Sequence, residues 1–242
     1  MAIENPLHQF TIERLIPIHI GGVDASYTNS ALLMTIAVVL VTGFVVLTTR
    51  GAALVPGRWQ SVTEMFYEFV VNMVDNNAGH GARPYLPFIF TLFAFILCGN
   101  LLGLIPYSFT FTSHIIVTFA LAVTVFVGVT IIGIARHGFR FLSLFVPHGV
   151  PVVLLVLLVP IELLSYCIRP FTLSIRLFAN MLAGHTMLVI FAGFVATLGV
   201  AGVLPIAVDT ALELLELLVA VLQAYVFAIL SCLYLADALH LH

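Results

Sequence analysis

Residues 160–190 read PIELLSYCIRPFTLSIRLFANMLAGHTMLVI, and this stretch governs the fold. It is apolar enough to lie in a lipid bilayer, yet it carries the charged or strongly polar residues Glu162, Arg169, Arg176, Asn180 and His185. On a helix, the polar residues from Glu162 to Asn180 share one face, in a stripe about 80° wide. A charge inside a membrane costs about 2.5 kcal/mol or more, so such residues mark an ion path, a proton relay or a structural ion pair.

The composition is typical of a polytopic membrane protein. Of the 242 residues, 62% are hydrophobic and 8% are charged, and the mean hydropathy is +1.20. The net charge is -3 and no basic run exists, which argues against a nucleic-acid partner. All 8 basic residues are arginine, which excludes a phosphate-binding loop that ends in Gly-Lys-Ser/Thr. The sequence also lacks an HExxH zinc pair and a GxSxG serine motif, so we expect no catalysis by this chain alone, no cofactor and no metal site.

The apolar runs predict an all-α fold with about five membrane-crossing helices in a single membrane domain, residues 1–242. The expected segments are a lead-in at 1–28, crossings at 29–49, 84–106 and 114–135, a surface amphipathic helix at 59–78, and a final pair of long helices at 151–198 and 205–238. The lead-in contains ENPLHQFTIERLIPI, which predicts a short interfacial helix limited by its prolines. For the helix at 59–78, two interpretations stay open, since it can lie on the membrane surface or pack on neighbouring protein.

The last two helices are too long to cross a bilayer upright. A helix over 151–198 is about 70 Å long, more than twice the hydrocarbon thickness of about 30 Å. We therefore expect a strongly tilted or bent hairpin, with Pro160 and Pro170 as places to bend.

The arginines outside the polar stripe predict the orientation of the chain. Five of the 8 basic residues follow the odd crossings or precede the even ones, namely Arg50, Arg58, Arg83, Arg136 and Arg140. The opposite turns, 107–114 and 199–204, contain no arginine. By the positive-inside rule, the N-terminus lies outside and the C-terminus inside.

A second polar stripe runs along 205–238, where Asp209, Glu213, Glu216 and Gln223 fall within about 40° of the same face. In an antiparallel hairpin these acids and His185 belong to the outer half of the membrane, whereas Glu162 belongs to the inner half. Arg176 stands between, and an arginine does not release its proton. A continuous proton wire would discharge the membrane potential. The pattern thus predicts two offset half-paths that are separated by a fixed cation and joined by a moving carboxylate from another chain.

Two segments carry a family resemblance. RPFTLSIRLFANMLAGH at 169–185 and LELLVAVLQAYVFAILSCLYLADALH at 215–240 resemble subunit a of F-type ATP synthases. The similarity covers essentially the whole chain, including CGNLLGLIP at 98–106 and SHIIVTFAL at 113–121. Gly184-His185 together with Glu216 resembles the mitochondrial and alphaproteobacterial version.

The resemblance implies the stationary proton-channel subunit of a rotary motor, with two half-channels that serve the carboxylates of a c-subunit ring and couple ring rotation to ATP synthesis. It implies that Arg176 is the essential cation that faces the ring. The implied proton path comprises Glu162 on the inner side and Asn180, His185, Glu216, Gln223 and Asn100, with Asp209 and Glu213 on the same face but matched less closely.

The same resemblance implies partners and a location. The partners are the c-subunit ring, b-type peripheral-stalk subunits, other membrane-sector subunits and the lipid bilayer. The location is an energy-transducing membrane, either the bacterial cytoplasmic membrane or the mitochondrial inner membrane.

Several alternatives stay open at the level of single residues and of function. Arg176 can pair with a carboxylate of its own chain, Glu162 can pair with Arg169, and Asn100 can join helices rather than line a path. A proton-coupled secondary transporter would use similar buried charges, although the sequence lacks a second copy of the 160–190 pattern. An intramembrane enzyme has no recognisable catalytic motif.

Overall fold

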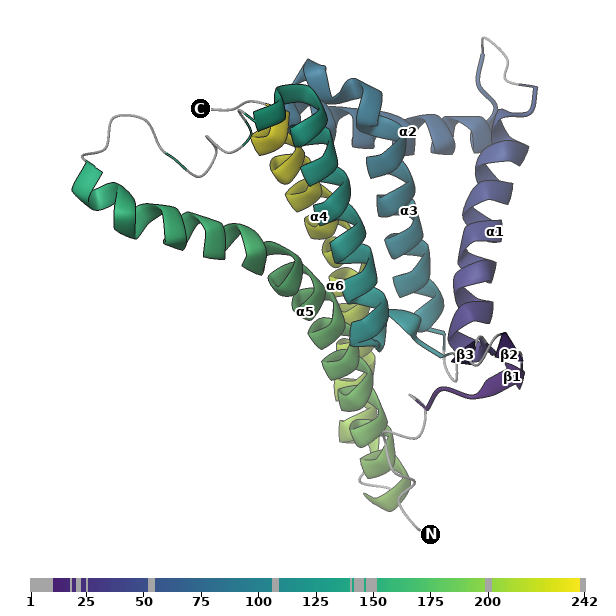
Figure 1. Cartoon of the computed structure of the whole chain (residues 1–242). Coiled ribbons are helices and arrows are strands. Elements are labelled where there is room, and N and C mark those ends of the chain that lie inside the picture. The colour runs from purple at the N-terminus through teal and green to yellow at the C-terminus, as the bar shows by residue number, and fades with distance from the viewer. Residues whose placement is uncertain are drawn as a thin grey trace. The chain divides into compact units, whose positions relative to one another are not determined.

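The computed structural model describes residues 11–17, 19–20, 23–24, 26–51, 55–105, 109–139, 141, 146, 152–198 and 202–239. Six α-helices dominate these residues (Figure 1): α1 (Asn29–Thr49), α2 (Arg58–Ala78), α3 (Leu86–Gly103), α4 (Ile115–His137), α5 (Val152–Leu198) and α6 (Val203–Leu239). Short 3-10 helices, η2 (His80–Tyr85) and η3 (Phe111–Ser113), precede α3 and α4. The predicted ends at 106 and 151 lie outside the described residues.

Five helical stretches of the described chain are long and apolar enough to cross a membrane. They are Asn29–Thr49, His80–Gly103, Ile115–His137, Leu154–Val195 and Pro205–Leu239. This confirms the predicted all-α membrane fold. The long penultimate helix, α5, continues through Pro160 and Pro170 without a break.

The described part of the N-terminal lead-in is β-structure, so the expected interfacial helix is wrong there. Strand β1 (Arg14–Ile16) pairs antiparallel with β4 (Tyr27–Thr28), and β2 (His19–Ile20) pairs with β3 (Val23–Asp24). Asn29 connects this hairpin to α1, because its backbone N–H donates to the carbonyl of Glu13 and its side-chain amide donates to that of Thr11. Pairing of the hairpin thus satisfies backbone groups that a proline-interrupted helix would leave open.

The chain forms two compact units. The first unit contains 1–50, 94–115 and 177–224, and the second contains 51–93, 116–176 and 225–242. Helices α3, α5 and α6 contribute a segment to each unit. The two units are described separately below.

In the second unit, α2 packs an aromatic and aliphatic face onto the start of α3. The ring of Phe66 stacks on Phe93 with centroids 5.1 Å apart, and Phe66 meets Phe90 edge-on at 5.6 Å. Val70 and Val74 of α2 are fully buried. One face of α2 therefore packs on neighbouring protein, as one of the two open interpretations predicted.

Hydrogen bonds between hydroxyl groups join α4 to the first half of α5 within the same unit. Thr118 and Ser174 lie 3.1 Å apart, and Thr130 lies 2.7 Å from the hydroxyl of Tyr166. Such pairs hold helices together inside a lipid bilayer, where no water is present to form hydrogen bonds with polar groups.

In the first unit, the second half of α5 runs alongside the first half of α6 (Figure 1). Leu177 and Met181 on α5, and Ala220 and Ala224 on α6, are fully buried. Small residues at such a contact let helix backbones approach closely. This contact positions most of the predicted outer half-path.

Candidate functional site

The predicted site residues divide between the two units. The first unit contains most of the predicted proton path, namely Asn100, Asn180, His185, Asp209, Glu213, Glu216 and Gln223. The second unit contains Glu162 and Arg176. The geometry is therefore built separately for each unit.

His185 and Glu216 form a buried acid–base pair between α5 and α6. Nδ1 of the imidazole lies 2.6 Å from Oε1 of the carboxyl group, and the side chains are only 11% and 4% exposed. Nε2 on the other side of the ring lies 3.1 Å from Oγ1 of Thr110. Both ring nitrogens are thus engaged, and the short contact at Nδ1 suits a shared proton.

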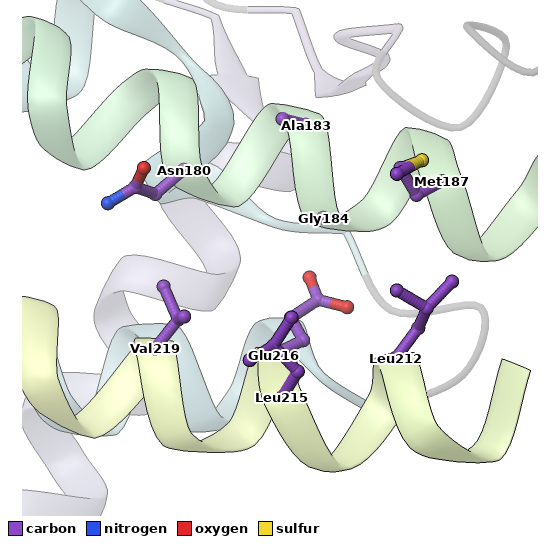
Figure 2. A pocket seen from close by; sticks show the side chains of 8 residues that line it. All are labelled: Asn180, Ala183, Gly184, Met187, Leu212, Leu215, Glu216 and Val219. Carbon is purple, nitrogen blue, oxygen red and sulfur yellow. The ribbon is translucent and has the colours of Figure 1, made fainter. Parts of the chain in front are cut away.

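Gly184 makes the close approach of the Glu216 carboxyl group possible. A Cβ atom at Gly184 would lie 2.8 Å from Oε1 and 2.9 Å from Cδ of Glu216. Figure 2 shows the carboxyl group pointing from α6 towards Gly184 on α5. The Gly-His dipeptide therefore has a physical reason, because glycine gives the acid room beside the histidine that binds it.

A cavity of about 210 Å³ adjoins this pair. Its lining comes from both helices and is mostly apolar, with Asn180 and Glu216 as the polar members (Figure 2). A water molecule occupies about 30 Å³ in the liquid, so a cavity of this size accommodates several. Glu216 thus lines a space large enough for water.

Two amide side chains extend the polar contact towards α3 and along the hairpin. Asn180 donates from Nδ2 to Oε1 of Gln223 at 3.0 Å, and Asn100 donates from Nδ2 to the Ala220 carbonyl at 3.0 Å. Asn100 and Gln223 are 0% and 1% exposed. Asn100 therefore joins α3 to α6, as one of its two open interpretations predicted.

Several buried polar atoms of the first unit have no hydrogen-bond partner among the described residues. They include Oδ1 of Asn100, Oγ1 of Thr112, Oδ1 of Asp209, Oε2 of Glu216 and Nε2 of Gln223. Buried polar atoms without a protein partner are rare and usually bind water or an ion. Three of these atoms, on Asp209, Glu216 and Gln223, lie along α6, which favours a hydrated path over a dry structural contact at this helix.

The two acids that matched the family pattern less closely have different surroundings. Asp209 is half-buried and lies on the same helical face as Glu216, whereas Glu213 is exposed. The structure therefore brings Asp209, but not Glu213, into the buried face of this stretch of α6.

In the second unit, Arg176 is exposed on α5 and forms no ion pair within the described part of the chain. Glu162 is half-buried. Arg169, the residue considered as its partner, instead binds Asp237 of α6, with Nη1 2.7 Å from Oδ2. Among the described residues, neither of the two open pairings is found: Arg176 forms no ion pair with a carboxylate, and Glu162 forms none with Arg169.

Asp237 and Thr110 contact polar residues of the 160–190 stretch, Arg169 and His185 respectively, without having been selected from the sequence. Asp237 appeared only as part of a family segment, and its partner Arg169 is 68 positions away. Thr110 lies in a turn rich in threonine and serine, where a hydroxyl residue is unremarkable in sequence. A search for hydroxyl groups near the ends of crossings would have included Thr110 among many others.

The arrangement can exchange and hold protons. Among the described residues, no group of 3 or more His, Cys, Asp or Glu side chains converges as metal ligands would. An imidazole and a carboxyl group in contact can share and transfer a proton near neutral pH.

Comparison with known proteins places the chain in a family. The sequence profile described as "ATP synthase A chain" matches residues 31–236. The protein named ATP synthase subunit a of Parvibaculum lavamentivorans is 58% identical, over 98% of this chain and 94% of its own. Those of Paramagnetospirillum magneticum and Rhodospirillum rubrum are each 54% identical, over 98% and 99% of this chain and 99% and 100% of their own. The predicted resemblance is thereby confirmed, and the chain belongs to the ATP synthase A chain family.

Proposed function

We propose that this chain is the stationary proton-channel subunit of a rotary ATP synthase, with two offset half-channels that serve a carboxylate on a rotating ring. Family membership makes it a membrane-sector component of an ATP synthase complex that does not catalyse covalent chemistry on its own. Coupling to the ring and the assignment of the half-channels go beyond what family membership establishes. These two parts of the proposal rest on the contacts, burial and charges of the residues described above.

The first unit supplies the outer half-channel in this proposal. Water reaches the Glu216 carboxyl group through the cavity beside Gly184, and Glu216 exchanges a proton with that water. Buried amide groups of Asn100 and Gln223, each with an atom that lacks a protein partner, continue the polar lining. Asn180 binds Gln223 and brings the lining to the turn of α5 that follows Arg176. Asp209 extends it towards the beginning of α6.

Glu162 in the second unit supplies the inner half-channel. It is half-buried, and Arg169, with which it could alternatively have paired, is bound to Asp237, so its carboxyl group remains available for proton exchange. A proton that has travelled on the ring leaves past Glu162. Glu213, which is exposed on α6, is assigned to the surface that faces outward from the helix pair.

One observation carries the proposal: Arg176 is an exposed cation in an apolar helix and binds no carboxylate of the described chain. A lone charge facing lipid is costly, so a partner anion is expected from another molecule. A carboxylate on a moving ring fits, because the permanent positive charge attracts its ionised form and cannot itself relay the proton. Arg176 thus separates the half-channels.

The proposed partners are a ring of c-type subunits at the Arg176 face, b-type peripheral-stalk subunits, other membrane-sector subunits and lipid. The named relatives are bacterial, so the proposed location is the bacterial cytoplasmic membrane, with the N-terminus outside and the C-terminus inside. This orientation rests on the distribution of arginine.

Cysteine cross-linking in native membranes tests the proposal. Thr172→Cys and Ala183→Cys place thiols at exposed positions of α5 on either side of Arg176, and Leu177→Cys provides a buried control. With a bifunctional thiol reagent, the exposed positions should link to a small hairpin protein that carries a mid-membrane carboxylate. The buried position should not. Links formed only within this chain would contradict the proposal and favour the transporter.

A further inference from the structure

We propose that Thr110 is a positioning residue of the outer half-channel, which fixes a hydrogen atom on Nε2 of His185 and so reserves Nδ1 for Glu216. This inference rests on the proposed function, because it assigns a task within the proton path that the proposal places at His185 and Glu216. Thr110 itself transfers no proton.

Thr110 is held firmly beside the imidazole. It is 1% exposed, lies just before η3, and donates its hydroxyl hydrogen to the Gly103 carbonyl at 3.2 Å. Gly103 permits this contact, since a Cβ atom there would lie 2.6 Å from Cγ2 of Thr110. The hydroxyl oxygen then lies 3.1 Å from Nε2 of His185.

Hydrogen counting assigns the histidine tautomer. A threonine hydroxyl has one hydrogen, and Gly103 receives it, so Oγ1 acts as an acceptor towards the ring. Nε2 of His185 must therefore carry a hydrogen. In the neutral ring, Nδ1 is then the unprotonated nitrogen, and it faces Oε1 of Glu216 at 2.6 Å.

The two groups then act as one site for a single shared proton. Either Glu216 is protonated at Oε1 and donates to Nδ1, or the proton sits on Nδ1 and the imidazolium donates to the carboxylate. When water delivers a proton to Oε2, the proton on Oε1 passes to Nδ1. The reverse transfer returns it, so protons and charge balance at each step.

Thr110 itself offers the imidazole no onward route for a proton. Its hydroxyl contacts Nε2 on one side and the Gly103 carbonyl on the other, and a backbone carbonyl does not pass a proton on. Exchange with the cavity therefore goes through Glu216, whose Oε2 has no partner in the described chain. In this arrangement His185 stores and returns a proton, whereas Glu216 transfers it.

The test compares variants that keep or remove the hydroxyl group, with the whole complex in membrane vesicles. Thr110→Val and Thr110→Ala remove the acceptor of Nε2–H, whereas Thr110→Ser keeps it. Thr124→Val is the matched control, because Thr124 is exposed and bonds only the Ala120 carbonyl of its own helix. ATP-driven proton pumping is measured per assembled complex.

The hydroxyl-free variants should pump about tenfold more slowly, since a hydrogen bond to a group that becomes charged is lost. Thr110→Ser should recover most of the rate, and Thr124→Val should match the parent. If Thr110→Val does not assemble, the smaller pair Thr110→Ala and Thr110→Ser decides. Equal rates for variants with and without the hydroxyl, whether both normal or both slow, would overturn the inference.

A parallel Glu216→Gln variant separates this inference from the proposed function. If Glu216→Gln pumps at the parental rate, the outer half-channel itself is wrongly assigned, and the proposed role of Thr110 is wrong as well. If Glu216→Gln blocks pumping while Thr110→Val pumps normally, the channel assignment stands and only the role of Thr110 is wrong.

Discussion

Two acid–base contacts link α5 to α6, one in each unit, and they differ in what they can do. Arg169 binds Asp237 at 2.7 Å, and their side chains are 21% and 41% exposed. His185 binds Glu216 at 2.6 Å, and theirs are 11% and 4% exposed. Distance alone does not distinguish them, but chemistry and surroundings do.

The Arg169 contact is a permanent ion pair. An arginine stays protonated at any physiological pH, and its guanidinium carbon lies 5.4 Å and 5.0 Å from the ring centroids of Tyr166 and Tyr234. The His185 contact joins two groups that can exchange a proton, beside a cavity lined by Glu216. The same helix pair therefore uses one contact to hold the helices together and, in the proposed function, the other to conduct protons.

Removing the acid from each contact in turn should give the largest difference. Glu216→Gln keeps the shape but loses proton exchange, so ATP-driven pumping should fall about 100-fold or more. Asp237→Asn keeps a hydrogen-bond acceptor for Arg169 and should retain most of the pumping rate. Acridine-dye quenching in inverted vesicles measures both. Equal loss in the two variants would contradict the division of roles.

Crowding the carboxyl group of Glu216 should have the next largest effect. Gly184→Ala adds a Cβ atom 2.8 Å from Oε1 and must displace the acid from its place beside His185. We expect pumping to fall roughly tenfold, in line with the cost of overpacking a tight contact.

Gly193→Ala is the matched control for this change. Gly193 lies in the same helix, and a Cβ atom there has nothing within 4 Å. Its pumping rate and assembly should match those of the parent. A Gly184→Ala variant that pumps normally would show that the close approach of Glu216 is not needed.

Breaking the permanent ion pair should affect stability more than transport. Arg169→Ala leaves Asp237 without its partner, which should destabilise the membrane sector by about 1–3 kcal/mol, since the pair is partly exposed. Arg169→Lys keeps the charge and should lose less. The measurement is the thermal inactivation midpoint, together with the pumping rate per intact complex. A normal midpoint with abolished pumping would move Arg169 into the proton path.

The crossings were predictable because their signal is local. A run of about 20 apolar residues identifies a membrane helix without reference to the rest of the chain. All five predicted crossings have counterparts among the candidate spans of the described residues. The short strands of the lead-in were not predictable in this way, because two-residue strands such as Tyr27–Thr28 depend on pairing rather than on their own sequence.

The site residues were predictable only as far as the helical period determines on which face of a helix each side chain lies. Periodicity placed Glu213 and Gln223 on one face of α6, yet Glu213 is exposed and Gln223 is buried. The period gives the face of a helix but not how far neighbouring helices cover it along the axis. Partners such as Asp237 for Arg169 need tertiary contacts for the same reason.

A third acid–base contact lies in the second unit, at the end of α2, and we expect it to have the smallest effect on stability of the three. Arg83 donates to Asp75 from Nη2 at 2.8 Å and from Nε at 3.1 Å, and Nδ1 of His80 lies 3.2 Å from the same carboxylate. The hydrogen bond from Arg83 holds the pKa of Asp75 below its ordinary value of 3.8. Because the folded state favours the ionised acid, the contact contributes stability above the ordinary pKa and loses it as the pH falls through the lowered one.

Asp75→Asn should therefore lower the thermal midpoint of the membrane sector slightly at pH 7, by less than Arg169→Ala does. Below the lowered pKa of Asp75, where the carboxyl group of the parent is itself neutral, parent and variant should unfold at nearly the same temperature. Differential scanning fluorimetry of the detergent-purified sector at both pH values measures this. A difference in thermal midpoint that persists unchanged in acid would mean that Asp75 acts through its shape and hydrogen bonds rather than through its charge. A drop in midpoint at pH 7 as large as that of Arg169→Ala would mean that this surface contact stabilises the protein as much as the one that joins two membrane helices.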